Sequence, residues 1–121
     1  MIRTTKQQER AQKAYGCFSP EKNVGDDYRQ FAKRFPALLH SCGLAQAVAF
    51  AQAKDKSAYL DDLSNVMRID DNSVLGNISR TVDLVEYLQI TREAIECATW
   101  IKRYAEATEE LSEKQEVSPE K

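Results

Sequence analysis

The sequence predicts an all-α protein, a compact single-domain bundle of about five to six helices. No stretch alternates apolar and polar residues with a period of two, as half-buried strands do. Apolar residues instead recur every three or four positions, which places them on one face of a helix. With 121 residues, 42% of them apolar, and four glycines, the chain can bury a core within one domain.

The segment Gly43–Lys54, GLAQAVAFAQAK, is predicted to be the central helix of this bundle. On a helix, Leu44, Val48 and Ala51 fall on one side, and Phe50 with further alanines covers most of the remaining surface. A helix that is apolar nearly all round is expected in the interior, and its alanines let neighbouring helices approach closely. We therefore expect a buried, alanine-rich central helix with Phe50 in the core.

Three helices are expected before this segment. Thr5 begins a capping box at the start of a first helix over 4–15. A second helix is expected over 26–35, where Pro36 ends it and opens a short third helix. Gly43 then allows a sharp junction with the central helix.

Three further helices are expected after the central segment. One begins near Tyr59 and stops near Asp70, and a brief one covers 73–80. Asp83 has the spacing of a capping residue and opens the longest helix, which should run to about Leu111. We expect this helix to lay a long apolar stripe against the core, made of Leu84, Leu88, Thr91, Ile95, Ala98, Ile101 and Ala105.

The C-terminal residues differ from the rest in composition. Residues 112–121 contain Val117 as their single apolar side chain and are predicted to be an acidic, disordered tail beyond a bundle domain of residues 1–111. The formal charge is −2, but without residues 106–121 the chain has fifteen basic and thirteen acidic residues. The folded part is therefore mildly basic.

The sequence offers no constellation for catalysis, and we expect a protein that is not an enzyme and holds no cofactor or metal. The three cysteines, Cys17, Cys42 and Cys97, are an odd number without CxxC spacing, so buried reduced thiols are expected rather than disulfides or zinc ligands. The single histidine, His40, has no carboxylate near it in sequence. No glycine-rich phosphate loop is present, and Asp71 is better explained as a helix cap than as a calcium ligand.

The chain is expected to be cytoplasmic, without a membrane partner. Nineteen residues between Arg34 and Lys54 carry no Asp, Glu, Lys or Arg, close to the roughly 20 that a bilayer span requires. Pro36, Gly43 and several polar side chains interrupt this stretch, so two short buried helices are the better interpretation. The first ten residues are polar and charged, and we expect no leader peptide.

Basic residues supply the candidate binding sites. They gather between positions 28 and 56, where Asp55 is the only acid, and along the longest helix. Such residues are suited to phosphate contacts, although solubilising charges at helix ends explain the pattern equally well. The candidates for RNA or subunit contacts are Lys33, Arg34, Lys54, Lys56, Arg92, Lys102 and Arg103.

Two separate blocks of the sequence resemble one known family. RFPALLHSCGLAQAVAFAQAK, residues 34–54, and YLQITREAIECATWIKRYAEA, residues 87–107, are similar to the small all-helical subunit of the type III-B CRISPR effector, the Cmr complex. The resemblance covers roughly residues 28–107, and Ser41 and Cys42 depart from the Asn expected before the glycine. The matching positions are Gly43, Leu44, Gln46, Phe50 and Lys54 in the first block and Thr91, Arg92, Glu93, Trp100, Lys102, Arg103 and Ala105 in the second.

The resemblance implies a structural role beside RNA. Several copies of such a subunit stack into a filament along the subunits that hold the guide RNA, contact other subunits of the complex and help to hold the target RNA, which base pairing reads. Two alternatives remain open. A helical adaptor that binds only protein would present Trp100 and Tyr104 to a partner. A DNA-binding regulator would use residues 44–54 as the recognition helix of a helix-turn-helix, although these residues have few side chains able to read bases.

Overall fold

The computed structural model describes residues 5–18 and 24–117, with side chains through Glu109. The predicted all-α fold is confirmed, since no strand occurs in these ranges. The helices are α1 (Lys6–Gly16), α2 (Asp26–Ala53), α3 (Ser57–Val66), α4 (Asn72–Thr81) and α5 (Leu84–Val117).

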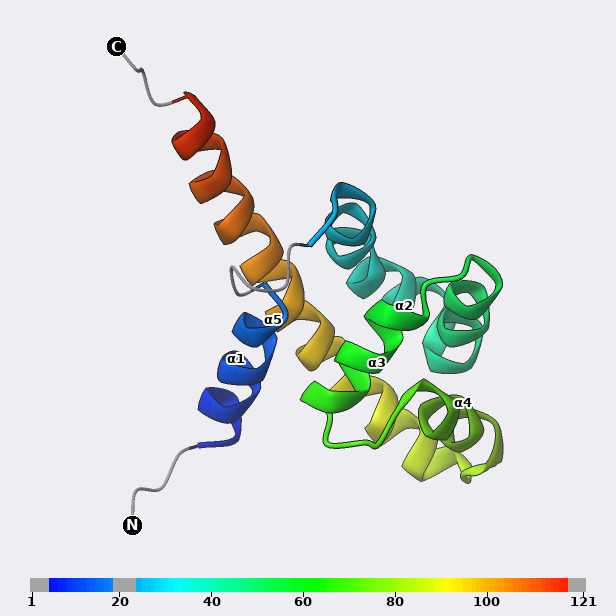
Figure 1. The fold of residues 1–121 in the computed structure, drawn as a ribbon. Helices are drawn as coiled ribbons and strands as arrows, with labels where there is room; N and C mark the ends of the chain where they lie inside the picture. Colours follow the sequence, from blue (N-terminus) through cyan, green and yellow to red (C-terminus); the bar gives the residue numbers. More distant parts are fainter. Residues whose placement is uncertain (1–4, 19–23, 118–121) are drawn as a thin grey trace.

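The long helix α5 is the support on which α1, α2 and α3 pack. Figure 1 shows α1 against one side of α5 and the group of α2, α3 and α4 on its other side. The most extensive packing is that of α2 on α5, and α4 packs on α2 and α3. The C-terminal turns of α5 extend away from the other helices (Figure 1).

Local capping signals set three of the helix starts, as predicted. Thr5 and Gln8 form a complete capping box at α1, in which each backbone N–H donates to the other side chain, at 2.8 and 3.0 Å. Asp71 caps α4 by accepting a hydrogen bond from the backbone of Val74 at 3.1 Å. Asp83 does the same for the first turn of α5. These bonds satisfy N–H groups that a helix start otherwise leaves without partners.

The prediction that Pro36 ends a helix is wrong, because α2 continues through it and the proline side chain is buried in the core. The chain bends at Gly43 instead, where φ is +83°, a conformation that glycine adopts readily and other residues rarely do. The bend divides α2 into a first arm, residues 26–42, and a second arm, residues 44–53. Tyr87 of α5 fixes the junction, since its Oη accepts a hydrogen bond from the backbone N–H of Ala45 at 3.1 Å.

The expectation that Phe50 lies in the core is also wrong, because the second arm is buried on one face only. Leu44, Val48 and Ala51 are buried as predicted, whereas Phe50 keeps 44% of its surface exposed. Successive helical residues turn by about 100°, so Phe50 points about 200° away from Val48. The second arm therefore has an apolar inner face and an outer face of alanine, glutamine and one exposed aromatic ring.

The apolar stripe predicted for α5 is correct over its middle and wrong at its start. Ala98, Ile101 and Ala105 are buried, but Leu84 and Leu88 are 70% and 53% exposed. At that end the core contact is made by Tyr87 instead, which packs partly buried against the core. Which side of the first turns is covered depends on the position of the second arm, which the periodicity of α5 alone does not reveal.

The C-terminal end of α5 lies beyond the predicted one, since the helix continues to Val117. Residues 118–121 of the predicted tail lie outside the described residues, and the division into 1–111 and 112–121 remains a prediction. Within the described part of the chain, no helix is long and apolar enough to cross a membrane.

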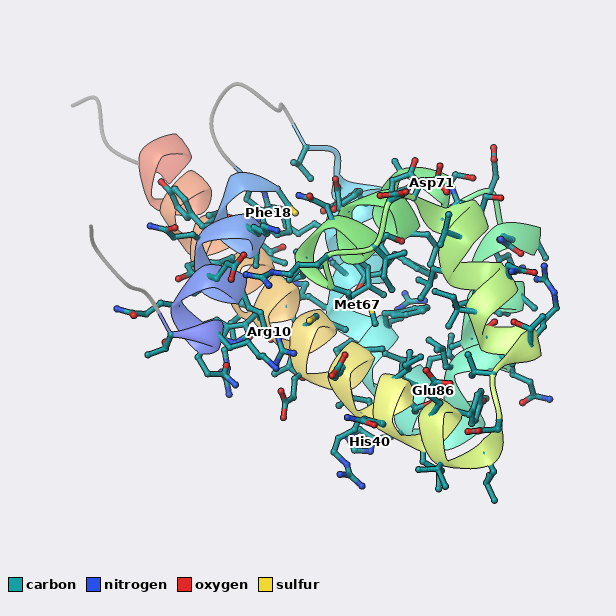
Figure 2. The ribbon with its side chains drawn as sticks, turned by 90° about the horizontal axis from the view of Figure 1, so that it is seen from below. Arg10, Phe18, His40, Met67, Asp71 and Glu86 are labelled. Atoms are coloured by element: carbon teal, nitrogen blue, oxygen red, sulfur yellow. The ribbon has the colours of Figure 1, made fainter. Side chains whose placement is uncertain are left out.

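Ion pairs attach α1 to its neighbours. The guanidinium of Arg10, a residue that is only 7% exposed, donates to Glu96 of α5, and Figure 2 shows Arg10 between the two helices. Arg68, just after α3, donates to Glu9 of α1, and this contact lowers the pKa of the Glu9 carboxyl. The short helix α1 is thus held by charge as well as by its buried Ala14.

Candidate nucleic-acid interface

An open pocket of about 330 Å³ lies where the two arms of α2 and the start of α3 come together. Three of its residues are basic, two are aromatic and one is acidic. We call it the basic pocket, and its lining residues are Asp27, Gln30, Phe31, Arg34, Phe50, Lys54 and Lys56.

The bend at Gly43 builds this pocket. It turns the second arm back, so that Arg34 of the first arm lines the same hollow as Phe50 of the second. The turn that follows adds Lys54, which ends α2, and Lys56, which precedes α3. Backbone hydrogen bonds hold this turn, including one from the Lys56 N–H to the Ala51 carbonyl at 2.9 Å.

The charges of the basic pocket are not neutralised by carboxylates. Within the described residues, Arg34, Lys54 and Lys56 take part in no ion pair. The ammonium groups of the two lysines lie over aromatic rings, each with Nζ 5.7 Å from a ring centroid, Lys54 over Phe50 and Lys56 over Phe31. Three cations against the single carboxylate of Asp27 make the pocket electropositive and suited to a phosphate group.

Sequence reasoning found the three basic residues but missed Phe50 as a surface group. A signal was present in the pattern, because the buried stripe of Leu44, Val48 and Ala51 leaves Phe50 on the opposite side. Phe50 lies outside this stripe and one turn before Lys54. An aromatic ring in that position can belong to a binding surface as well as to a core.

The other four candidates do not line the basic pocket. Lys33 is engaged within the fold, since its Nζ pairs with Glu109 of α5 at 2.5 Å. Arg92 is exposed on α5, and Lys102 is partly exposed. The Arg103 guanidinium lies 5.2 Å from the centroid of the Trp100 ring. Whether any of the seven candidates contacts RNA or another subunit remains a prediction.

The aromatic pair considered as a partner surface is built into the α1–α5 contact. Trp100 stacks on Tyr104 with centroids 6.2 Å apart, and its indole N–H donates to Gln7 of α1 at 2.7 Å. Both rings are partly buried. Their packing within the subunit already accounts for their position.

Two groups with raised pKa values lie fully buried in the core. Burial raises the pKa of Cys97 to about 11 and the pKa of Tyr59 well above its ordinary value. Both side chains are inaccessible, so these shifts follow from packing. Cys17 is also buried, but the prediction of buried thiols is wrong for Cys42, which is exposed.

The structure brings together no recognisable metal or acid–base centre in the part of the chain that it describes. No group of three His, Cys, Asp or Glu side chains is placed to hold a metal ion there. His40 lies exposed on the outer surface (Figure 2). The arrangement can attract and hold an anion, and this is the chemistry that the basic pocket offers.

Comparison with known proteins agrees with the two sequence blocks. The family model described as CRISPR-associated protein (Cas_Cmr5) matches residues 6–108. The CRISPR system Cmr subunit Cmr5 of Thermus thermophilus is 37% identical over 108 residues, which cover 85% of this chain and 95% of the relative. The Cmr5 subunit of Thermotoga maritima is 29% identical over 90 residues, covering 71% and 70% of the two chains.

A solved structure supports the same assignment. The crystal structure of a CRISPR-associated Cmr5 family protein from Thermus thermophilus superposes with a TM-score of 0.79 at 34% identity, covering 86% of this chain and 97% of the other. The chain therefore belongs to the Cmr5 family of CRISPR-associated proteins.

Proposed function

We propose that the chain is the Cmr5 subunit of a type III-B CRISPR effector, the Cmr complex, in the cytoplasm. In this proposal it is a noncatalytic subunit that stacks in several copies beside the guide-RNA backbone and helps to hold target RNA. Family membership supports the assignment to the complex. The basic pocket, with three cations that no carboxylate neutralises in the described residues, is the observation that supports the contact with RNA.

The strength of such a contact follows from its few charges. Each neutralised phosphate of a single strand contributes a salt slope of about 0.7, so one subunit with three cations binds weakly and without sequence preference. Copies aligned beside one strand act together, because each further contact forms at high effective concentration. Weak sites on several stacked copies are therefore sufficient to help hold a target strand that is already base-paired with the guide.

The chemistry of the basic pocket favours binding over cleavage. Its lining residues include one carboxylate, Asp27, and no histidine or cysteine. General acid–base cleavage of a phosphodiester commonly uses a histidine or a pair of carboxylates, and the lining of the pocket has neither. Sequence would be read by guide pairing and the protein would supply surface and charge.

Exposed apolar residues at the start of α5 support the contact with other subunits. Leu84, Val85 and Leu88 are each more than half exposed and adjoin one another on the first turns of the helix. A contiguous apolar group of this kind is typical of a protein contact surface. Stacking of copies or packing on another Cmr subunit would cover it.

The proposal is tested by target-RNA retention in complexes assembled with Arg34→Gln, Lys54→Gln or Lys56→Gln. Each change should leave assembly and helix content intact and lower the salt slope of target binding by about 0.7 per copy that contacts a phosphate. Lys6→Gln is the matched control, since Lys6 is an exposed lysine on α1 outside the basic pocket. If all three variants assemble normally and retain target RNA with an unchanged salt slope, the proposed RNA contact is wrong and the subunit is only a protein spacer.

A further inference from the structure

We propose that the basic pocket binds one unpaired nucleotide of single-stranded RNA, with the base stacked on Phe50. This inference rests on the proposed function and deepens it, because it assigns the pocket a base as well as a phosphate. The juxtaposition that carries it is an exposed aromatic ring among three cations free of ion pairs within the described residues.

Phe50 differs from the other exposed apolar residues in its surroundings. The described chain also exposes Tyr15, Val74 and the apolar group at the start of α5, and isolated exposed side chains are common. Only Phe50 among them lines a pocket with Arg34 and Lys56 and has an ammonium group over its ring. The ring therefore lies where an anionic ligand would be drawn.

A nucleotide matches both features of this pocket. Its phosphate is an anion and its base is a flat π surface, and proteins that hold single strands combine basic grooves with aromatic rings on which bases stack. A duplex exposes its phosphates, but its bases are stacked on one another, so none of them can stack on the Phe50 ring. A ring among cations thus favours an unpaired nucleotide over a paired one.

The lysine over the ring can take part without breaking an ion pair. The Lys54 Nζ lies 5.7 Å from the centroid of the Phe50 ring, and Phe50 as a residue is still 44% exposed. A flexible lysine held only by a ring can move to a phosphate at small cost. The Gln30 amide, also in the lining, can donate to and accept from a base edge.

The size and openness of the hollow fit one nucleotide without strict discrimination. Its volume of about 330 Å³ is at the lower end of the range for small-molecule sites. Stacking accepts every base because each has a π face. The pocket should therefore tolerate all four bases, as expected for a subunit that must hold any target.

The test uses the full chain at low salt, where electrostatic binding is strongest, with three labelled RNA probes of equal phosphate number. The probes are a single strand, an abasic single strand and a duplex. Phe50→Leu keeps an apolar side chain but removes the ring, and Phe50→Trp restores a ring. Tyr15→Leu is the matched control, because Tyr15 is a similarly exposed aromatic, at 50%, outside the pocket.

We expect Phe50→Leu to weaken binding of the single strand by roughly 5- to 100-fold and to leave the salt slope unchanged. Binding of the abasic strand and of the duplex should not respond, while Phe50→Trp should retain the preference for a strand with bases. Tyr15→Leu should behave as the unaltered chain. Circular dichroism of each variant checks that the helices are intact.

The outcomes separate this inference from the proposed function. If Phe50→Leu binds both single strands as the unaltered chain does, while Lys54→Gln lowers the salt slope, the stacking is wrong and the charge contact stands. If Phe50→Leu impairs assembly of the complex but not RNA binding, the ring is a protein contact and the inference is overturned. No binding of any probe by the unaltered chain at low salt would contradict both proposals.

Discussion

Replacing Gly43 by alanine should destabilise the protein strongly, because the bend of α2 depends on this residue in two ways. At φ +83° and ψ 170° the backbone is in a region that residues with a Cβ rarely occupy, which costs roughly 1 to 3 kcal/mol. A Cβ at this position would also lie 2.8 Å from the Tyr87 Oη, so the ring must shift. That shift would weaken or break the hydrogen bond that the Ala45 N–H donates to the Tyr87 Oη, which is worth about 0.5 to 1.5 kcal/mol. We expect a total loss of roughly 2 to 4 kcal/mol.

The two contributions can be separated by a double-mutant cycle in urea, followed by far-ultraviolet circular dichroism. In a Tyr87→Phe background the hydroxyl that a Cβ would meet is absent, so Gly43→Ala should cost about 1 kcal/mol less than in the unaltered chain. Gly16→Ala is the matched control. A Cβ there meets nothing within 4 Å at the end of α1, and the free energy of unfolding should stay the same or rise.

The result that would refute this reasoning is a loss below about 1 kcal/mol for Gly43→Ala with no coupling to Tyr87. The bend would then be imposed by packing rather than by the backbone of this residue. Because the bend also brings Arg34 and Phe50 to one pocket, the variant that folds should bind single-stranded RNA less well.

Four further predictions rest on which side chains are buried and which are exposed. In chemical unfolding, Phe50→Ala should lower the free energy of unfolding by less than about 1 kcal/mol, whereas Leu44→Ala, fully buried nearby, should cost roughly 2 to 5 kcal/mol. An alkylating reagent should modify Cys42 rapidly in the native state and Cys97 only after unfolding, as mass spectrometry can verify, and native labelling of Cys97 would contradict its burial. Since the folded pKa of Cys97 is raised from 9.0 to about 11, its contribution to stability is complete below pH 9 and is lost as the pH rises toward 11. Leu88→Glu should leave the isolated chain folded but reduce its incorporation into the complex, measured by co-purification. Full incorporation of this variant would show that the start of α5 does not contact other subunits.

The features that were predictable from sequence are those fixed by residues close together in the chain. The capping box of Thr5 needs only Gln8, three residues away, and Asp71 needs only Val74. The glycine before the second arm likewise marks its own bend. Short-range hydrogen bonds and backbone freedom suffice for such features, so helix order and most helix starts followed from the sequence.

Most of the wrong predictions concern which residues are covered by other helices. Pro36 interrupts one hydrogen bond but lies in a buried position where the helix continues, and Leu88 has the right period but is 53% exposed. Phe50 is apolar, yet the second arm shows it to solvent. Each outcome depends on helices far away in sequence, so the periodicity of a single segment was insufficient.

The adjacent residues Lys33 and Arg34 show why the binding site was only partly predictable. They are equivalent by charge and position in the sequence, and both were candidates. A helix turns by about 100° between them, so they cannot serve the same surface. Lys33 meets Glu109, 76 residues later, and its charge is used to hold α2 on α5. Arg34 lines the basic pocket with the second arm. The same α2–α5 packing that neutralises the first cation thus leaves the second one available, and this distinction exists only once the chain is folded.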